Sequence, residues 1–146
     1  MHIEISKEVI KDIADKLDCG FVCYYHIKNK NVVDIPEFAF DDPEQEEFWG
    51  NDINEIETNY DKYVEIAPPS SDKSFIFMEQ FIETIDDLTL RNRFENAINK
   101  SRPFENFKCL INDSGDYTRK WFDFKNEKLM EIVESEIEAY NFKIKN

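Results

Sequence analysis

The sequence predicts an α+β fold, in which an N-terminal helix and a small antiparallel sheet precede a C-terminal bundle of about four helices. β-Forming residues gather in three short runs before residue 70, and apolar residues recur at helical spacing after it. The length of 146 residues fits one domain. We therefore expect a single domain over 1–146, with a helix-plus-sheet half at 1–70 and a helical half at 71–146.

The first half begins with a helix and continues into three strands. Ser6 can cap a helix over about 7–18, and Gly20 can end it. The runs FVCYYHI and VVDIP flank a KNKN turn and predict a β-hairpin that closes at Pro36, and YVEIAPP at 63–69 predicts a third strand. FVCYYHI is also a candidate for a sheet edge that pairs across a dimer, although the sequence itself defines no oligomeric state.

Four helices are expected in the second half. SFIFMEQFIETI forms the first, and Asp86-Asp87 can start the second, LTLRNRFENAIN. Pro103 fits the first turn of the third, which ends at NDSG, and the fourth runs from about 117 to 140.

The apolar residues of the fourth helix do not share one face. At about 100° per residue, Tyr117, Trp121 and Phe124 lie on one side. Nearly opposite lie Phe122, Leu129, Val133, Ile137 and Tyr140. Either the first turns are buried on both sides, or the helix breaks near Phe124.

Composition narrows the class of protein. The chain has 32 acidic and 18 basic residues, a net charge of −14, which disfavours nucleic acid and anionic membranes as partners. It contains no apolar stretch long enough to span a membrane and no signal peptide at its N-terminus, so we expect a cytoplasmic protein. Three cysteines at no framework spacing suit a reducing compartment.

Residues 37–59 contain nine acidic residues and no Lys or Arg. We expect a solvated loop with one or two short helical turns, anchored by Phe48 and Trp49. The segment lacks the ligand spacing and central glycine of a calcium loop. A basic protein partner is the occupant that its charge favours. The candidate partner-binding residues are Asp41, Asp42, Glu44, Glu46 and Glu47.

The stretch 102–124 contains six aromatic residues, and the overlapping stretch 91–120 holds seven basic residues against four acidic ones. Aromatic stripes at helical spacing are usually core, so we expect Phe104, Phe107 and Trp121 to join the last two helices. A basic rim beside aromatic rings can also hold a small phosphate-bearing ligand. The candidate ligand-binding residues are Arg102, Lys108, Arg119 and Trp121.

No catalytic or metal signature stands out. Cys19, Cys23 and His26 resemble zinc ligands, but positions 23 and 26 point to opposite faces of an extended strand, and no second ligand pair follows. Cys23 and His26 fail as a nucleophile and base for the same reason, and the three glycines form no phosphate loop. We expect no cofactor and no metal, and the sequence favours a protein that is not an enzyme.

The strand YVEIAP, the helix FMEQFIETIDD, the block AINKSRPFENFK and the motif KWFDF, followed by a long acidic helix, resemble a bacterial family known as uncharacterised protein family 0158. The resemblance covers roughly residues 60–140. Members tend to have small and basic residues in the Phe-x-x-Phe block, where this chain has Pro103 and Glu105. The resemblance implies a small cytosolic bacterial protein and supplies no activity or cofactor.

These observations favour a non-catalytic protein-interaction or regulatory domain that binds a basic protein partner, with no nucleic acid and no membrane involved. The alternative is a binder of, or an enzyme acting on, a small anionic ligand at the basic aromatic block 102–124.

Overall fold

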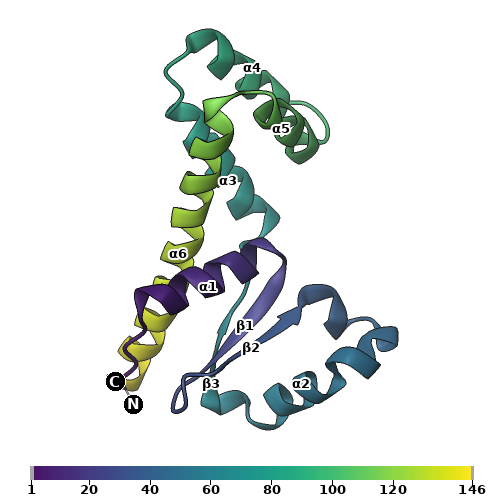
Figure 1. Cartoon of the computed structure of the whole chain (residues 1–146), viewed down its shortest axis with the longest axis vertical. Helices are drawn as coiled ribbons and strands as arrows, with labels where there is room; N and C mark the ends of the chain where they lie inside the picture. The colour runs from purple at the N-terminus through teal and green to yellow at the C-terminus, as the bar shows by residue number, and fades with distance from the viewer. Residues whose placement is uncertain (1, 146) are drawn as a thin grey trace. The chain divides into compact units, whose positions relative to one another are not determined.

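The computed structural model describes residues 2–145 and divides the chain into two compact units (Figure 1). The first, here called the sheet unit, comprises Met1–Pro68 and Leu129–Asn146. The second, the helical unit, comprises Pro69–Lys128. The predicted α+β class is confirmed, with a three-stranded antiparallel sheet and a helical C-terminal region. That the two units form a single domain stays a prediction.

The sheet unit begins with helix α1 (Lys7–Asp18), whose bounds match the prediction. The Ser6 hydroxyl accepts a hydrogen bond from the Val9 N–H at 3.2 Å, which satisfies one of the free donors of the first turn. Gly20 follows the helix with a φ of 84°, a left-handed conformation that favours glycine. A capped start and a glycine stop therefore define this helix.

The sheet contains β1 (Phe21–His26), β2 (Val32–Pro36) and β3 (Tyr63–Ile66), in the order β2-β1-β3. Both pairings of β1 are antiparallel. The expectation that FVCYYHI lies at a sheet edge is wrong, because β2 and β3 occupy the two edges. A strand that is hydrogen-bonded on both sides has no free backbone groups for pairing across a dimer.

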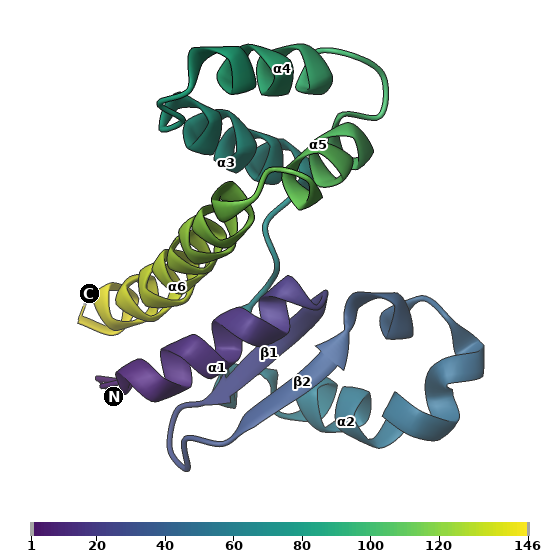
Figure 2. The ribbon, with the colours of Figure 1, turned by 45° about the horizontal axis from the view of Figure 1, so that its top comes forward.

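Alternate residues of β1 enter two different cores. Cys23 and Tyr25 pack with α1 and the last turns of helix α6 (Asp116–Lys145). Val22 and Tyr24 pack on the other face with Ile56 of helix α2 (Glu46–Thr58), as the position of α2 beneath the sheet in Figure 2 illustrates. Because both faces of the strand are covered, its apolar run is continuous rather than alternating.

The acidic segment is more helical than expected. Two short 3₁₀ turns, η1 (Glu37–Phe40) and η2 (Pro43–Gln45), lead into the 13-residue α2, and η3 (Tyr60–Lys62) precedes β3. The prediction of a mostly irregular loop is therefore corrected. Of the two expected anchors, Trp49 packs edge-on against Phe21 at 6.2 Å between ring centroids, whereas Phe48 is 74% exposed and anchors nothing.

The helical unit contains α3 (Ser71–Glu83), α4 (Leu88–Ile98), α5 (Pro103–Asn112) and the first turns of α6. Asp87 caps α4 by accepting the N–H groups of Thr89 and Leu90 at 3.0 and 3.1 Å, as the acidic pair predicted. The buried core of the helical unit consists of Met78, Phe81, Ile82, Ile85, Phe94, Ile98, Phe107 and Ile111.

Helix α6 is continuous from residue 116 to 145, so it does not break near Phe124. Its first turns are not buried on both sides either, because Phe122 is 55% exposed. Tyr117, Trp121 and Phe124 pack against the core of the helical unit. Leu129, Val133 and Ile137 belong instead to the core of the sheet unit. The apolar face changes along the helix because its two ends serve two different cores.

Candidate functional site

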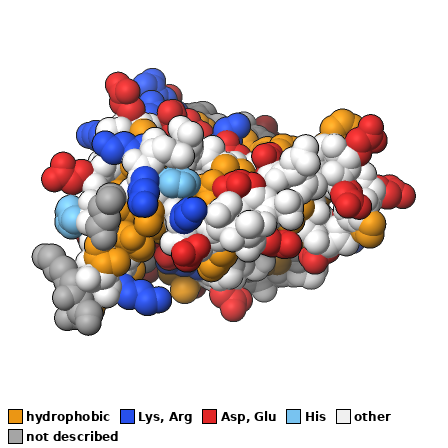
Figure 3. Space-filling model, turned by 90° about the horizontal axis from the view of Figure 1, so that it is seen from below, with side chains coloured by type: hydrophobic (Ala, Val, Ile, Leu, Met, Phe, Trp, Pro, Cys, Tyr) orange, Lys and Arg blue, Asp and Glu red, His pale blue; other side chains and the backbone are white. Residues whose placement is uncertain are grey.

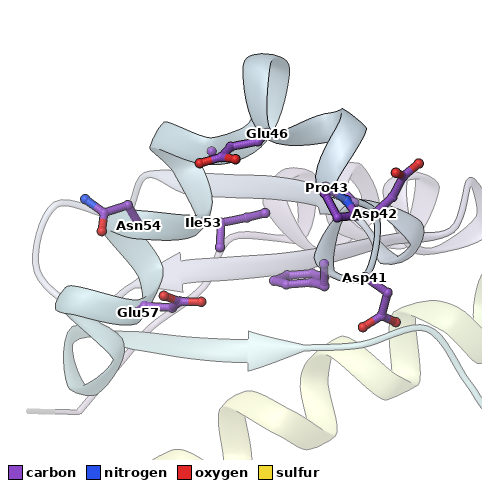
Figure 4. Close-up of a pocket in the computed structure, with 10 residues that line it drawn as sticks. Asp41, Asp42, Pro43, Glu46, Ile53, Asn54 and Glu57 are labelled. Atoms are coloured by element: carbon purple, nitrogen blue, oxygen red, sulfur yellow. The ribbon is translucent and has the colours of Figure 1, made fainter.

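A groove of about 350 Å³ lies on the sheet unit, between the η1–η2 segment and α2. We call it the acidic groove, and Figure 4 shows Glu46, Ile53 and Glu57 along α2 with Asp41, Asp42 and Pro43 from the η1–η2 side. Its complete lining is Ala39, Phe40, Asp41, Asp42, Pro43, Glu46, Gly50, Ile53, Asn54 and Glu57. The volume is within the range of sites that hold a side chain or a small ligand.

Helical spacing brings one face of α2 to this groove. Residues 46, 50, 53 and 57 follow one another by four, three and four positions, which places them on one stripe. Gly50 leaves room at the centre of the stripe, since a Cβ there would lie 3.1 Å from Cγ of Glu46. Along this stripe, the carboxylates of Glu46 and Glu57 therefore lie at the two ends, and the apolar side chain of Ile53 lies between them.

The carboxylates of the groove have no cationic partner within the described part of the chain. Asp42 accepts the N–H of Glu44 at 3.0 Å, a local bond that caps η2. Among the described residues, the ion pairs Lys16–Asp34, Arg91–Glu95 and Arg102–Glu105 lie elsewhere, and none reaches the carboxylates of the groove. This part of the protein therefore carries uncompensated negative charge.

Aromatic side chains are exposed around the same segment. Phe38 is 61% exposed, and Phe40, which lines the groove, and Tyr60 are also exposed. In Figure 3 acidic and hydrophobic side chains gather at the right-hand end, where the η1-to-α2 segment lies in Figure 1, and no Lys or Arg is seen there. Exposed apolar groups bordered by charge are typical of surfaces that bind another molecule.

Tyrosine hydroxyls of the sheet unit donate hydrogen bonds to two carboxylates, Glu65 and Glu55. Glu65 accepts from the hydroxyls of Tyr24 and Tyr60 at 2.9 and 3.3 Å, and Glu55 accepts from Tyr63 at 2.7 Å. Burial first, and then the hydrogen bond to Glu55 and its charge, raise the pKa of Tyr63 to about 12. Burial and Glu65 raise the pKa of Tyr24 as well.

The structure brings together three of the five predicted partner-binding residues. Asp41, Asp42 and Glu46 line the acidic groove, whereas Glu44 and Glu47 are exposed outside its lining. Sequence reasoning missed Glu57, together with Phe40, Ile53 and Asn54. The spacing of residues 46, 53 and 57 was the available signal, and it is informative only once the segment is treated as a helix.

The predicted ligand-binding residues lie in the helical unit. Arg102 contacts Glu105 at 3.6 Å, and both side chains are exposed. Lys108 and Arg119 are exposed as well. The Trp121 ring packs against Phe107 and Phe81, at 4.8 and 5.3 Å between centroids. The ring thus contributes to the core, and ligand binding by this set stays a prediction.

Cys23 and His26, which were considered as metal ligands and as a nucleophile and base, are a buried core residue and a residue beside the hairpin turn. The Cys23 thiol is buried, and burial and the charge of its cross-strand neighbour Asp34 raise its pKa. His26 accepts the N–H groups of Lys28 and Asn29 at Nδ1, both at 3.1 Å, and so closes the hairpin turn. Over residues 2–145, no three His, Cys, Asp or Glu side chains are grouped to hold a metal ion. No helix in this range has the length and apolarity to cross a membrane.

The fold and the groove define a small α+β protein with an acidic, aromatic-bordered surface. The chain belongs to the Uncharacterised protein family (UPF0158), whose profile matches residues 11–144. No curated protein matches the chain. No solved structure matches it either.

Proposed function

We propose that this protein is a non-catalytic interaction domain, and that its acidic groove binds a basic segment of a partner protein. The observation that carries the proposal is the combination of unpaired carboxylates with exposed aromatic rings around one groove. A partner segment with Lys or Arg beside apolar side chains matches both features.

The chemistry of such a segment fits the lining of the groove. An arginine can lay its aliphatic stem on Ile53 and its guanidinium beside Phe40, where cation–π attraction adds to the charge of Asp41 and Glu57. Rim charges of this kind chiefly speed the association of oppositely charged partners. Binding by the acidic groove should therefore weaken steeply as salt is added.

Binding of a basic partner would also reduce the repulsion between carboxylates in the free protein. Nine carboxylates between residues 37 and 59 repel one another, and no Lys or Arg lies in the segment to offset them. Neutralising them should leave the fold intact or make it slightly more stable. Loss of binding without loss of folding would then identify a surface kept acidic for recognition.

The test is a variant that neutralises Asp41, Asp42, Glu44, Glu46 and Glu47 together as Asn or Gln. The probe is a fluorescent amphipathic helical peptide with Lys and Arg on one face and Leu on the other, measured by anisotropy. We expect the five-fold variant to bind it at least about tenfold more weakly, because several charge contacts are lost. Affinity capture from a bacterial lysate with the same variant should lose basic partners.

The matched control neutralises five exposed carboxylates of α6, and so changes the net charge equally. Its residues are Asp123, Glu127, Glu134, Glu136 and Glu138. The control should keep most of the affinity. Equal weakening by both variants would mean that only net charge attracts the peptide, and undiminished binding by the five-fold variant would exclude the acidic groove.

A further inference from the structure

A second groove, of about 530 Å³, lies on the helical unit between α4 and α5. We call it the α4–α5 groove, and it lies at some distance in sequence from the acidic segment. It is lined by Arg93, Asn96, Ala97, Lys100, Asn106, Cys109, Leu110 and Asp113. Polar side chains predominate, and two cations line the groove, Arg93 of α4 and Lys100 of the segment that follows it. The groove is large enough for a small metabolite.

The two cations of this groove have no charged partner within the described part of the chain. Arg91 is paired with Glu95 at 3.1 Å, Arg102 contacts Glu105, and Lys120 lies over the ring of Tyr117. Arg93 and Lys100 are exposed and have no ion pair with any described side chain. Neither charge is therefore offset by an ion pair within the described chain, although acidic residues outnumber basic ones by 32 to 18.

The positions of the polar groups give the groove a definite pattern. Arg93 lies in α4, whereas Lys100 lies in the connection to α5, two residues after the last residue of α4. Asn96 lies between them. On α5, Asn106 donates its amide hydrogens to the carbonyls of Ala97 and Ser101, at 3.0 and 2.9 Å. These bonds fix the Asn106 side chain and direct its acceptor oxygen away from those carbonyls.

We propose that the α4–α5 groove binds a small phosphate-bearing metabolite that also carries hydroxyl groups. Arg93 and Lys100 supply charge-assisted hydrogen bonds to the phosphate, for which the planar guanidinium is the better geometric match. Asp113 is the acceptor that a hydroxyl donor requires, and it would repel a bare anion. Asn96 can donate or accept. The lining therefore favours a sugar phosphate over inorganic phosphate.

The experiment is a titration of the ¹⁵N-labelled full-length chain, followed by NMR, with glucose 6-phosphate, AMP and inorganic phosphate as separate probes. We expect saturable shifts of the Asn96 and Asn106 side-chain amides with at least one organic phosphate. Arg93→Gln with Lys100→Gln should weaken that binding at least about tenfold, because two charge-assisted hydrogen bonds are lost. Both residues are exposed and unpaired, so the double variant should fold normally by circular dichroism.

The matched control is Lys108→Gln with Arg119→Gln, which removes the same charge from exposed positions outside the groove lining. It should bind like the natural chain. Equal weakening in the two variants would overturn the proposal in favour of diffuse attraction by the basic residues of the helical unit. Selective weakening in the control would place the ligand at the block 102–124 and would overturn it too. Absence of saturable shifts with all three probes would also overturn it.

Asp113→Asn separates the hydroxyl contact from the phosphate contact. Because an amide accepts less strongly than a carboxylate and carries no charge, glucose 6-phosphate should bind more weakly, whereas inorganic phosphate should bind the same or better. Tighter binding of both probes would show that Asp113 only repels the anion, and would overturn its assigned role.

Discussion

Asn141 and Ile3 exchange two hydrogen bonds across 138 positions of sequence. The Ile3 N–H donates to Oδ1 of Asn141 at 2.7 Å, and Nδ2 of Asn141 donates to the Ile3 carbonyl at 2.9 Å. One side chain thus satisfies both backbone groups of a residue that precedes α1. Ile3 is buried in the core of the sheet unit, so an alternative partner in water is not available to it.

Asn141→Ala should therefore lower the free energy of unfolding by about 1–3 kcal/mol, since two partly buried backbone groups lose their partner. Urea denaturation measures the loss, and amide exchange at Ile3 should become faster. Asn92→Ala, at an exposed position of α4, is the control and should be neutral or slightly stabilising, because Ala favours helix. An unchanged exchange rate at Ile3 would show that the pair contributes nothing.

Trp121→Ala should be strongly destabilising. Its ring contacts Phe107, Phe81 and Phe124 in the helical unit, and loss of such an aromatic side chain typically costs about 3–5 kcal/mol. Because Trp121 is only half-buried, we expect the lower end of this range.

The matched comparison is a triple neutral variant of Arg102, Lys108 and Arg119. Exposed ion pairs are worth about 0–1 kcal/mol, so it should unfold close to the natural chain in guanidinium. If Trp121→Ala unfolded no earlier than the triple variant, the ring would be available for ligand binding and the core assignment would fail.

Gly50→Ala should separate stability from binding. Ala in a helix interior is more favourable than Gly by up to about 1 kcal/mol, so α2 should become more stable. The new Cβ approaches the flexible Glu46 side chain and narrows the acidic groove. We expect a higher midpoint of thermal unfolding together with weaker binding of the basic peptide. A variant that gained stability and kept full affinity would place the peptide outside the groove.

The raised pKa of Tyr63 predicts that the folded protein loses stability in strong alkali. Its pKa is raised from 10.0 to about 12 in the folded protein, so folding favours the protonated phenol. The stability that the protonated phenol of Tyr63 contributes is complete below about pH 10 and is lost as the pH rises through about 12. Urea unfolding of Tyr63→Phe across this window should show a shallower decline than that of the natural chain. Identical slopes would refute the assignment.

The parts of the fold that could be predicted are those with local signals. The sequence predicts Ser6 as a helix cap, the pair Asp86-Asp87 as a helix start and Pro103 as a first-turn residue, because each acts through neighbouring backbone groups. The central position of β1 could not be predicted in this way, since strand order depends on contacts between residues far apart in sequence.

Helix α2 was missed for identifiable physical reasons. It starts directly from η2 with no side-chain cap, contains Gly50, and buries only Ile56. The weak amphipathic pattern of this segment is typical of a solvated loop, so the sequence does not indicate a helix. The acidic groove was therefore predicted as a charged segment, and Glu57 was not connected to Asp41 because that connection exists only when the segment is helical.

The order of segments also determines the order in which the nascent chain can fold. Everything that the core of the helical unit requires has been translated once residue 128 leaves the ribosome. The sheet, although synthesised first, lacks Leu129, Val133 and Ile137 until the end of α6 appears. The part of the apolar surface that these three residues cover thus stays exposed until then, and a chaperone would protect it during this period.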